Sequence, residues 1–279
     1  MFFQTVFLIP LLLISFSCNS KGQKKMKSPK EYDLNNPEII NLTKKIDQIS
    51  GIVYSEKDNS LFAIDDDKGD LYNITLTKDP EIKKWKFGKN ADYEDLMLID
   101  TMVYILESSG KIIRFPLRFP ITDVKEQAID LKGFNEFESL YFDAAEQRLI
   151  MLCKECKKDD ADIVSAYSFF VAADSFSKQP VLHLKRKEIE KKVGEKPGRI
   201  KASAAAVNPL TGEVFIISSI NKLLIIADRN YNIKEVYDLR RSLFKQPEGI
   251  CFAPDGTLFI SNEAGENSKA DILIYKRLQ

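Results

Sequence analysis

Glutamates recur directly in front of short apolar segments along this chain. Glu94 is followed by DLML, Glu138 by SLYF and Glu248 by GICF, while Ser50 and Ser203 stand at the matching place in two similar segments. Carboxylates that converge in a folded protein repel one another, so they require protons or a cation. Oxygen ligands without histidine suit Ca²⁺, and Mg²⁺ less well. If these positions meet in space, Glu94, Glu138 and Glu248 are candidate calcium ligands.

A second set of polar residues ends the next apolar segment of several repeats. Asp66, Glu107 and Glu263 hold this place, and with Ser50 and Ser203 they are candidate outer ligands of the same ion. The alternative is structural, in which the acids accept hydrogen bonds from backbone N–H groups where repeats meet. Calcium-dependent stabilisation that disappears when Glu94 and Glu138 become glutamine would distinguish the two.

Three further patterns carry weaker chemistry. DDDKGD (65–70) begins like a calcium-binding loop, but the twelfth position, which needs a bidentate acid, is Leu76, so a turn between strands is expected. Cys153 and Cys156 have redox or zinc spacing without a second pair, and after export they could form a local disulfide. His183, the only histidine, is expected on an outer strand. Histidine-dependent nucleophilic catalysis therefore lacks a base, and no catalytic residue is assigned.

The glutamates belong to segments that repeat. Five copies begin at residues 50, 94, 138, 203 and 248, each with a short apolar strand, a turn, a second strand with a polar end, and a third strand. The segments LFAI, VYIL, LIML, VFII and LFIS are rich in β-branched and aromatic residues and lack a helical period. A repeat of about 45 residues with four short strands is typical of a propeller blade. The sequence predicts an all-β, five-bladed β-propeller.

Both ends of the chain support ring closure. The last repeat supplies three strands, and residues 37–43 resemble the fourth strands of other repeats, so this N-terminal segment is expected to complete the last blade and leave no open sheet edge. The first strand of a blade lines the central channel, which places the recurring glutamates around one mouth. The propeller is assigned to residues 34–279, with an insertion around 155–200 in the third repeat.

The insertion contains a basic stretch, residues 183–201. A short solvated helix is expected there, and the alternative is a docking surface for an acidic partner. Trp85 is expected on an outer strand, packed between blades. The whole chain has 41 basic and 41 acidic residues, so no global charge points to nucleic acid as a partner.

The N-terminus has the features of an export signal. Residues 6–18 are apolar, too short to span a bilayer, and end in Ser-Phe-Ser before Cys18, which resembles the lipobox of bacterial lipoproteins. Residues 1–18 are therefore predicted to be a lipoprotein-type signal with Cys18 as the lipidated residue. A plain secretory signal or an uncleaved anchor is the alternative. Residues 19–33 are polar and lysine-rich and are predicted to form a flexible tether.

An ordered set of motifs over residues 45–278 resembles a known family. ISGIVY, LFAIDDDKGDLY, DYEDL, FESLYFD, NPLTGEVFIISS and PEGICFAPDGTLFISNE are similar to the SdiA-regulated family of bacterial propellers. The resemblance implies a five-bladed propeller, distantly similar to NHL repeats, with a calcium site, and it implies interaction with other proteins rather than an established activity. The chain departs most from this pattern over residues 153–200.

Two functions remain open on these grounds. The first is an envelope-anchored, calcium-binding module that recognises a protein or small ligand at the channel mouth, on the outer membrane or the periplasmic face. It would be a monomer that meets the membrane only through its lipid anchor. The second is a metal-dependent hydrolase of a phosphoester or lactone that uses the axial carboxylates. The missing histidine base favours the binding module.

Overall fold

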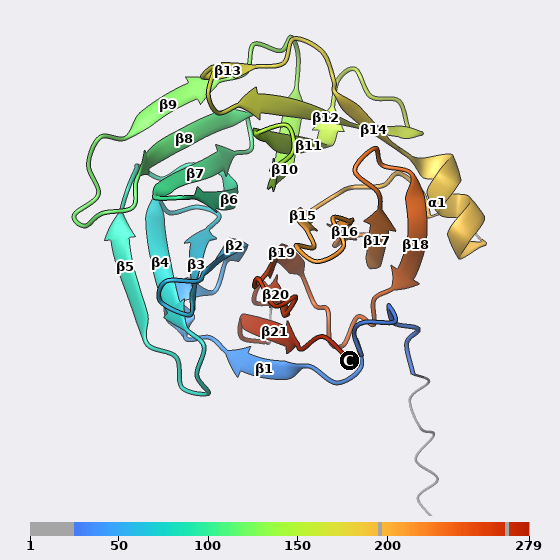
Figure 1. The fold of residues 1–279 in the computed structure, drawn as a ribbon, viewed down its shortest axis with the longest axis horizontal. Coiled ribbons are helices and arrows are strands. Elements are labelled where there is room, and N and C mark those ends of the chain that lie inside the picture. Colours follow the sequence, from blue (N-terminus) through green and yellow to red (C-terminus); the bar gives the residue numbers. More distant parts are fainter. Residues whose placement is uncertain (1–24, 195–196, 266–267, 279) are drawn as a thin grey trace, which may run out of the picture.

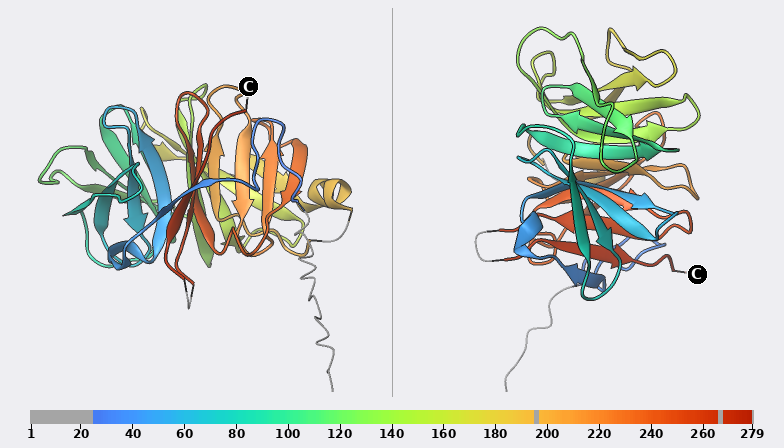
Figure 2. Two further views of the ribbon diagram at one scale, coloured as in Figure 1. Left: turned by 90° about the horizontal axis from the view of Figure 1, so that it is seen from below. Right: turned by 90° about the vertical axis from the view of Figure 1, so that its left-hand side faces the viewer.

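Four four-stranded antiparallel sheets and one five-stranded sheet surround a central axis (Figure 1). The computed structural model describes residues 25–194, 197–265 and 268–278. The predicted all-β, five-bladed propeller is confirmed, and in every blade the first strand of the repeat lies innermost. Figure 2 shows the same blades from the side, with their strands running between the two mouths of the ring.

The first two blades follow the predicted repeat. Blade 1 is made of β2 (Ile49–Ser55), β3 (Ser60–Asp65), β4 (Asp70–Thr75) and β5 (Ile82–Lys86). Blade 2 is made of β6 (Tyr93–Ile99), β7 (Met102–Glu107), β8 (Lys111–Pro116) and β9 (Lys125–Ala128).

The third blade is the expanded one. It has β10 (Asn135–Asp143), β11 (Arg148–Cys156) and β12 (Ile163–Phe170). Its fourth strand is split into two pieces, β13 (Ser175–Phe176) and β14 (Leu182–Lys185), which both pair with β12. The expected helix follows as α1 (Arg186–Val193), which buries Ile189 and carries exposed lysines.

The last two blades complete the ring together with the N-terminal strand β1. Blade 4 is made of β15 (Ala204–Val207), β16 (Val214–Ser218), β17 (Leu223–Ala227) and β18 (Ile233–Asp238). Blade 5 is made of β19 (Pro247–Phe252), β20 (Leu258–Asn262), β21 (Asp271–Tyr275) and the N-terminal β1 (Glu38–Asn41). β1 pairs antiparallel with β21, from Glu38 opposite Ile274 to Asn41 opposite Asp271. The predicted closure by residues 37–43 is thus confirmed, and a 3-10 turn, η1 (Lys44–Ile46), leads into blade 1.

The hydrophobic core is divided among the blade interfaces. Five buried clusters each combine apolar side chains from two neighbouring blades, for example Phe62 with Phe115 between blades 1 and 2. Because alternate residues of a strand point to opposite faces, each central strand contributes to two clusters. The ring is therefore held by packing between blades as well as by β1. No helix in the described ranges has the length and apolar character that crossing a membrane requires.

The predicted tether is shorter than residues 19–33 at its C-terminal end. Tyr32 is buried between blades 4 and 5, where its hydroxyl donates to the Gly256 carbonyl at 2.8 Å. Met26 accepts a hydrogen bond from the Arg240 N–H, and the Leu278 N–H donates to the Glu31 carbonyl. The lysine-rich composition of this segment favoured a flexible tether, although Met26 and Tyr32 attach its C-terminal part to the propeller. Cys18 and the predicted signal lie outside the described residues.

Candidate functional site

The three glutamates occupy one structural position in three blades. The strand register skips Glu94 between Tyr93 and Asp95, Glu138 between Phe137 and Ser139, and Glu248 between Pro247 and Gly249. Each glutamate is therefore the extra residue of a β-bulge in an innermost strand. A bulge removes a residue from the ladder and redirects its side chain.

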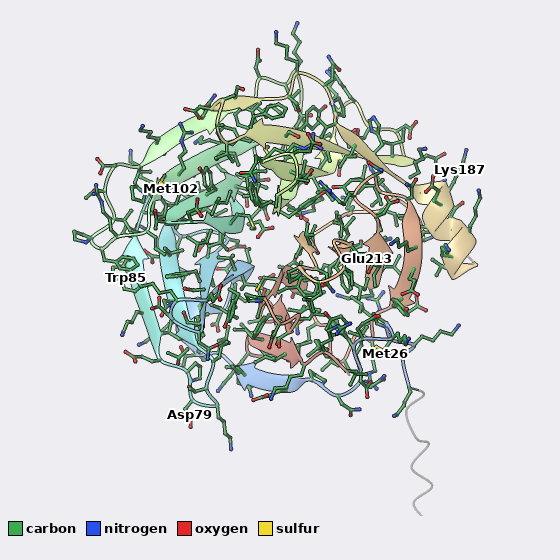
Figure 3. The ribbon with its side chains drawn as sticks, in the orientation of Figure 1. Met26, Asp79, Trp85, Met102, Lys187 and Glu213 are labelled. Atoms are coloured by element: carbon green, nitrogen blue, oxygen red, sulfur yellow. A yellow bond between two sulfur atoms is a disulfide. The ribbon has the colours of Figure 1, made fainter. Side chains whose placement is uncertain are left out.

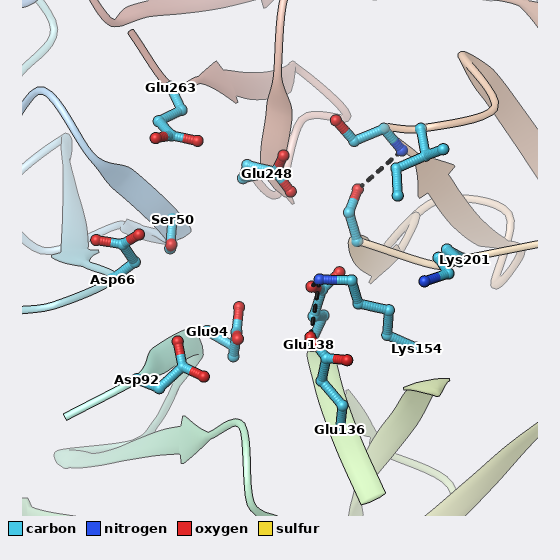
Figure 4. A pocket seen from close by; sticks show the side chains of 13 residues that line it. Ser50, Asp66, Asp92, Glu94, Glu136, Glu138, Lys154, Lys201, Glu248 and Glu263 are labelled. Carbon is cyan, nitrogen blue, oxygen red and sulfur yellow. Dashed lines mark hydrogen bonds and ion pairs between the residues drawn. The ribbon is translucent and has the colours of Figure 1, made fainter. Parts of the chain in front are cut away.

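The glutamates line one cavity at a mouth of the channel (Figure 4). This cavity measures about 230 Å³. Ser50, Asp66, Ser203 and Glu263, predicted as outer ligands, also line it. In all, seven carboxylates and two ammonium groups surround it among the described residues: Asp66, Asp92, Glu94, Glu136, Glu138, Glu248, Glu263, Lys154 and Lys201. We refer to this cavity as the acidic mouth.

Crowding and burial favour protonated carboxylates here. Burial, together with nearby Asp92, raises the pKa of Glu94 from its usual 4.5 to about 8. Burial also raises the pKa of Glu248 to about 7, against a hydrogen bond from Ser219 that works in the other direction. The pKa values of Asp66 and Glu263 are raised as well, in both cases chiefly by burial. The ionised form of this group of acids is destabilised unless a cation joins it.

Lys154 is the cation closest to the glutamates. Its Nζ lies 3.0 Å from Oε1 of Glu136 and also pairs with Glu138. Lys201, in contrast, turns to Glu155, whose Oε2 it reaches at 3.0 Å. Figure 4 shows both lysines on the side of blades 3 and 4, while Glu94, Glu248, Asp66 and Glu263 face them across the cavity.

Glu107 does not join the acidic mouth. In three blades the residue that follows the second strand donates its backbone N–H to the carbonyl of the residue that precedes the innermost strand. The donor and acceptor residues are Asp66 and Gln48, Ser108 and Asp92, and Glu263 and Gln246. The counterpart of Asp66 and Glu263 in blade 2 is therefore Ser108. Glu107 lies one residue earlier, so its side chain turns to the other face and pairs with Lys111 at 2.8 Å.

Sequence reasoning also missed residues of this cavity. Asp92, Glu136 and Lys201 stand two residues before Glu94, Glu138 and Ser203, and the period of a strand predicts that they face the same way. The equivalent Gln48 and Gln246 donate to the carboxylates of Asp66, at 3.5 Å, and Glu263, at 2.8 Å. This spacing was visible in the sequence.

The donor set of the acidic mouth fits a hard cation. Asp66 Oδ1 is buried and accepts no hydrogen bond, and within the described chain the Glu94 carboxylate has neither a hydrogen bond nor an ion pair. Oxygen donors with unused lone pairs are what Ca²⁺ requires. The oxygens of Glu94, Glu138 and Glu248 do not form a set within 4.8 Å of one another, unlike those of Asp65, Asp66 and Asp67.

The other predicted features are structural. DDDKGD forms the turn between β3 and β4, where buried Asp65 pairs with Lys68 at 2.9 Å. Cys153 and Cys156 form a disulfide, so with Asp159 they are no metal site. His183 is exposed on the outer strand β14, 3.3 Å from the Ser165 hydroxyl. Trp85 stacks on Phe119 of the next blade, as expected for packing between blades. Figure 3 places Trp85 at the rim of the ring, far from the channel.

Known proteins resemble the chain in sequence pattern and in fold. A family model described as SdiA-regulated matches residues 28–265. No curated protein sequence matches the chain. Among solved structures, glutaminyl cyclase from Myxococcus xanthus has a TM-score of 0.58 at 12% identity, covering 87% of this chain and 96% of its own. Regucalcin from Agrobacterium tumefaciens, a calcium-binding protein, has a TM-score of 0.51 at 11% identity, covering 88% and 94%. At these identities the likeness shows the fold alone.

Proposed function

The chain belongs to the SdiA-regulated family, and from that premise we propose that it is an envelope-anchored β-propeller that binds Ca²⁺ at the acidic mouth and serves as a binding or protein-interaction module. One observation carries the calcium proposal. Three blades each use a bulge to turn a glutamate into one small cavity, where seven carboxylates face two ammonium groups. Regucalcin, a calcium-binding protein of similar fold, lends general support.

Glu94, Glu138 and Glu248 would hold the ion, with Asp66, Glu263, Ser50 and Ser203 nearby as further oxygen donors. Bound calcium would offset the repulsion among these acids and hold three blades in one arrangement. The mouth would then present a rigid rim to a protein or small ligand. A binding role of this kind requires no residue to act as a general acid or base.

Calcium titration of the purified propeller tests this proposal. We expect heat of binding by calorimetry and a rise in Tm with calcium, because an ion that binds only the folded state stabilises it. Glu94→Gln and Glu138→Gln should each abolish the rise. Glu126→Gln, an exposed acid on β9, serves as the control and should behave like the wild type. A rise in Tm that survives both mouth substitutions would contradict the assignment.

A calcium-dependent hydrolase of phosphoesters or lactones is the second candidate. The described lining contains no histidine or cysteine, and its hydroxyl groups are those of Ser50, Ser203 and Ser219. The Ser203 hydroxyl donates to the Pro247 carbonyl at 2.9 Å, which does not activate it as a nucleophile. These facts favour binding. Turnover of generic phosphoester or lactone substrates that vanishes in Glu138→Gln would reverse this preference.

The anchor and the partner need tests of their own. Labelled palmitate should enter the full-length chain in bacteria and fail to enter a Cys18→Ser variant. Capture from an envelope fraction should recover a partner with calcium present and lose it with EDTA. Size-exclusion chromatography with light scattering should give the mass of a monomer.

A further inference from the structure

Blade 3 differs from the other glutamate-bearing blades in carrying a second bulge. Glu136 lies opposite Glu155 and Phe137 opposite Cys153, so Lys154 is an extra residue of β11. In blades 2 and 5 the second strand continues without such a residue, from Leu106 to Glu107 and from Ser261 to Asn262. Lys154 thus stands where Asp66 and Glu263 stand in blades 1 and 5, so blade 3 presents an ammonium group to the mouth where those blades present carboxylates.

Two facing bulges bring opposite charges together. Glu138 is the unmatched residue of β10 and Lys154 that of β11, and their side chains pair in the acidic mouth. Both are well covered, with side-chain exposures of 10% for Glu138 and 22% for Lys154. A covered pair is less screened by solvent than a surface pair.

A disulfide closes the bulge that holds Lys154. Cys153 and Cys156 are buried, their Cα atoms lie 5.7 Å apart, and Lys154 and Glu155 are the two residues between them. Lys154 points to Glu136 and Glu138, while Glu155 points to Lys201 on the way into blade 4. The bridge therefore fixes the segment from which the ammonium group enters the mouth.

We infer that Lys154 is a built-in counter-ion of the acidic mouth, which occupies Glu138 in the metal-free protein and competes with calcium for that carboxylate. The inference rests on the calcium function proposed above. It gives the three glutamates unequal roles, because Glu138 forms a direct ion pair with Lys154 that the metal must displace, whereas Lys154 acts on Glu94 and Glu248 only from a distance. Lys154 would then set the calcium concentration at which the mouth fills.

Removing the competing charge tests the inference. Lys154→Gln should bind calcium about tenfold more tightly than the wild type in calorimetry, the change that about 1.4 kcal/mol of lost competition gives. In EDTA its Tm should be lower, because seven acids then face one lysine fewer. Lys154→Arg, which keeps the charge, should remain close to the wild type in both measurements.

Lys111 provides a matched control outside the mouth. It bridges Glu107 and Glu126 much as Lys154 bridges Glu138 and Glu136. Lys111→Gln should leave calcium affinity unchanged. If the wild type binds calcium and Lys154→Gln binds it no more tightly, the competition is overturned while the calcium function stands. If neither the wild type nor Lys154→Gln binds calcium, the calcium function fails. If Lys154→Gln has the same Tm in EDTA as the wild type, the counter-ion role is overturned as well.

Discussion

Glu94 and Glu248 make the stability of the metal-free protein depend on pH. Their pKa values in the folded chain are about 8 and about 7, above the usual 4.5 that they have when unfolded. As pH rises from 4.5 to the folded pKa values of about 7 and about 8, the unfolded chain releases protons that the folded chain retains. The stability of the folded chain therefore falls with rising pH. It stops falling above the folded pKa values.

We therefore expect the Tm in EDTA to drop by roughly a few degrees between about pH 5.5 and 8.5. Glu94→Gln should make the dependence shallower and leave the part that Glu248 contributes, since the amide does not titrate. Saturating calcium should flatten it too, because the ion favours the ionised carboxylate. Thermal melts across this range check the prediction, and a Tm that rises with pH in EDTA would contradict it.

Gly51 and Asp95 allow the innermost strands to approach one another. Asp95 is buried and accepts hydrogen bonds from the N–H groups of Leu96, at 2.8 Å, and Leu140 of the next blade, at 2.7 Å. A Cβ atom at Gly51 would lie 2.6 Å from the Asp95 Cα, which no side-chain rotation relieves. Gly51→Ala should cost about 1–3 kcal/mol in urea unfolding. Gly265→Ala, whose Cβ would come no closer than 3.3 Å to a described neighbour, the Ser268 hydroxyl, should cost far less.

At the scale of elements, the repeat was predictable and its irregularities were not. Alternating apolar segments and turn residues predict the blades, since they depend on local propensity and burial. The position of a bulge depends on which residue is left unpaired in the strand ladder. Neither YEDL (93–96) nor FESL (137–140) contains a residue type that determines this position. That is why Glu107 was placed at the mouth instead of Ser108, and why Lys154 was not recognised as the partner of Glu138.

The Cys153–Cys156 bridge gives a prediction about the element that it closes. Replacing both cysteines with serine should lower the free energy of unfolding by about 2 kcal/mol, as expected for closing a very short loop. Because Lys154 would be held less firmly on Glu138, calcium affinity should move toward that of Lys154→Gln. Urea unfolding and calorimetry on one preparation measure both. Wild-type affinity in the double variant would show that the bridge does not position Lys154.

At the scale of the whole molecule, β1 is the element that completes the ring. Ile40 is buried against blade 1, whereas its neighbour Ile39 is 43% exposed. Ile40→Ala should therefore cost about 2–4 kcal/mol, and Ile39→Ala close to zero. Both keep the backbone pairing with β21, so their comparison in urea isolates the packing of the closing strand. Equal losses would mean that β1 contributes through its backbone alone.

The same closure sets an order of events during synthesis. β1 leaves the ribosome before every other described strand, and its partner β21 leaves after all of them. At about 5–20 residues per second, on the order of 10–50 s separate the two. For that time the nascent chain is an open arc with free edges, which a neighbouring chain can join instead. Any factor that delays folding until β21 has emerged would remove this risk of strand exchange.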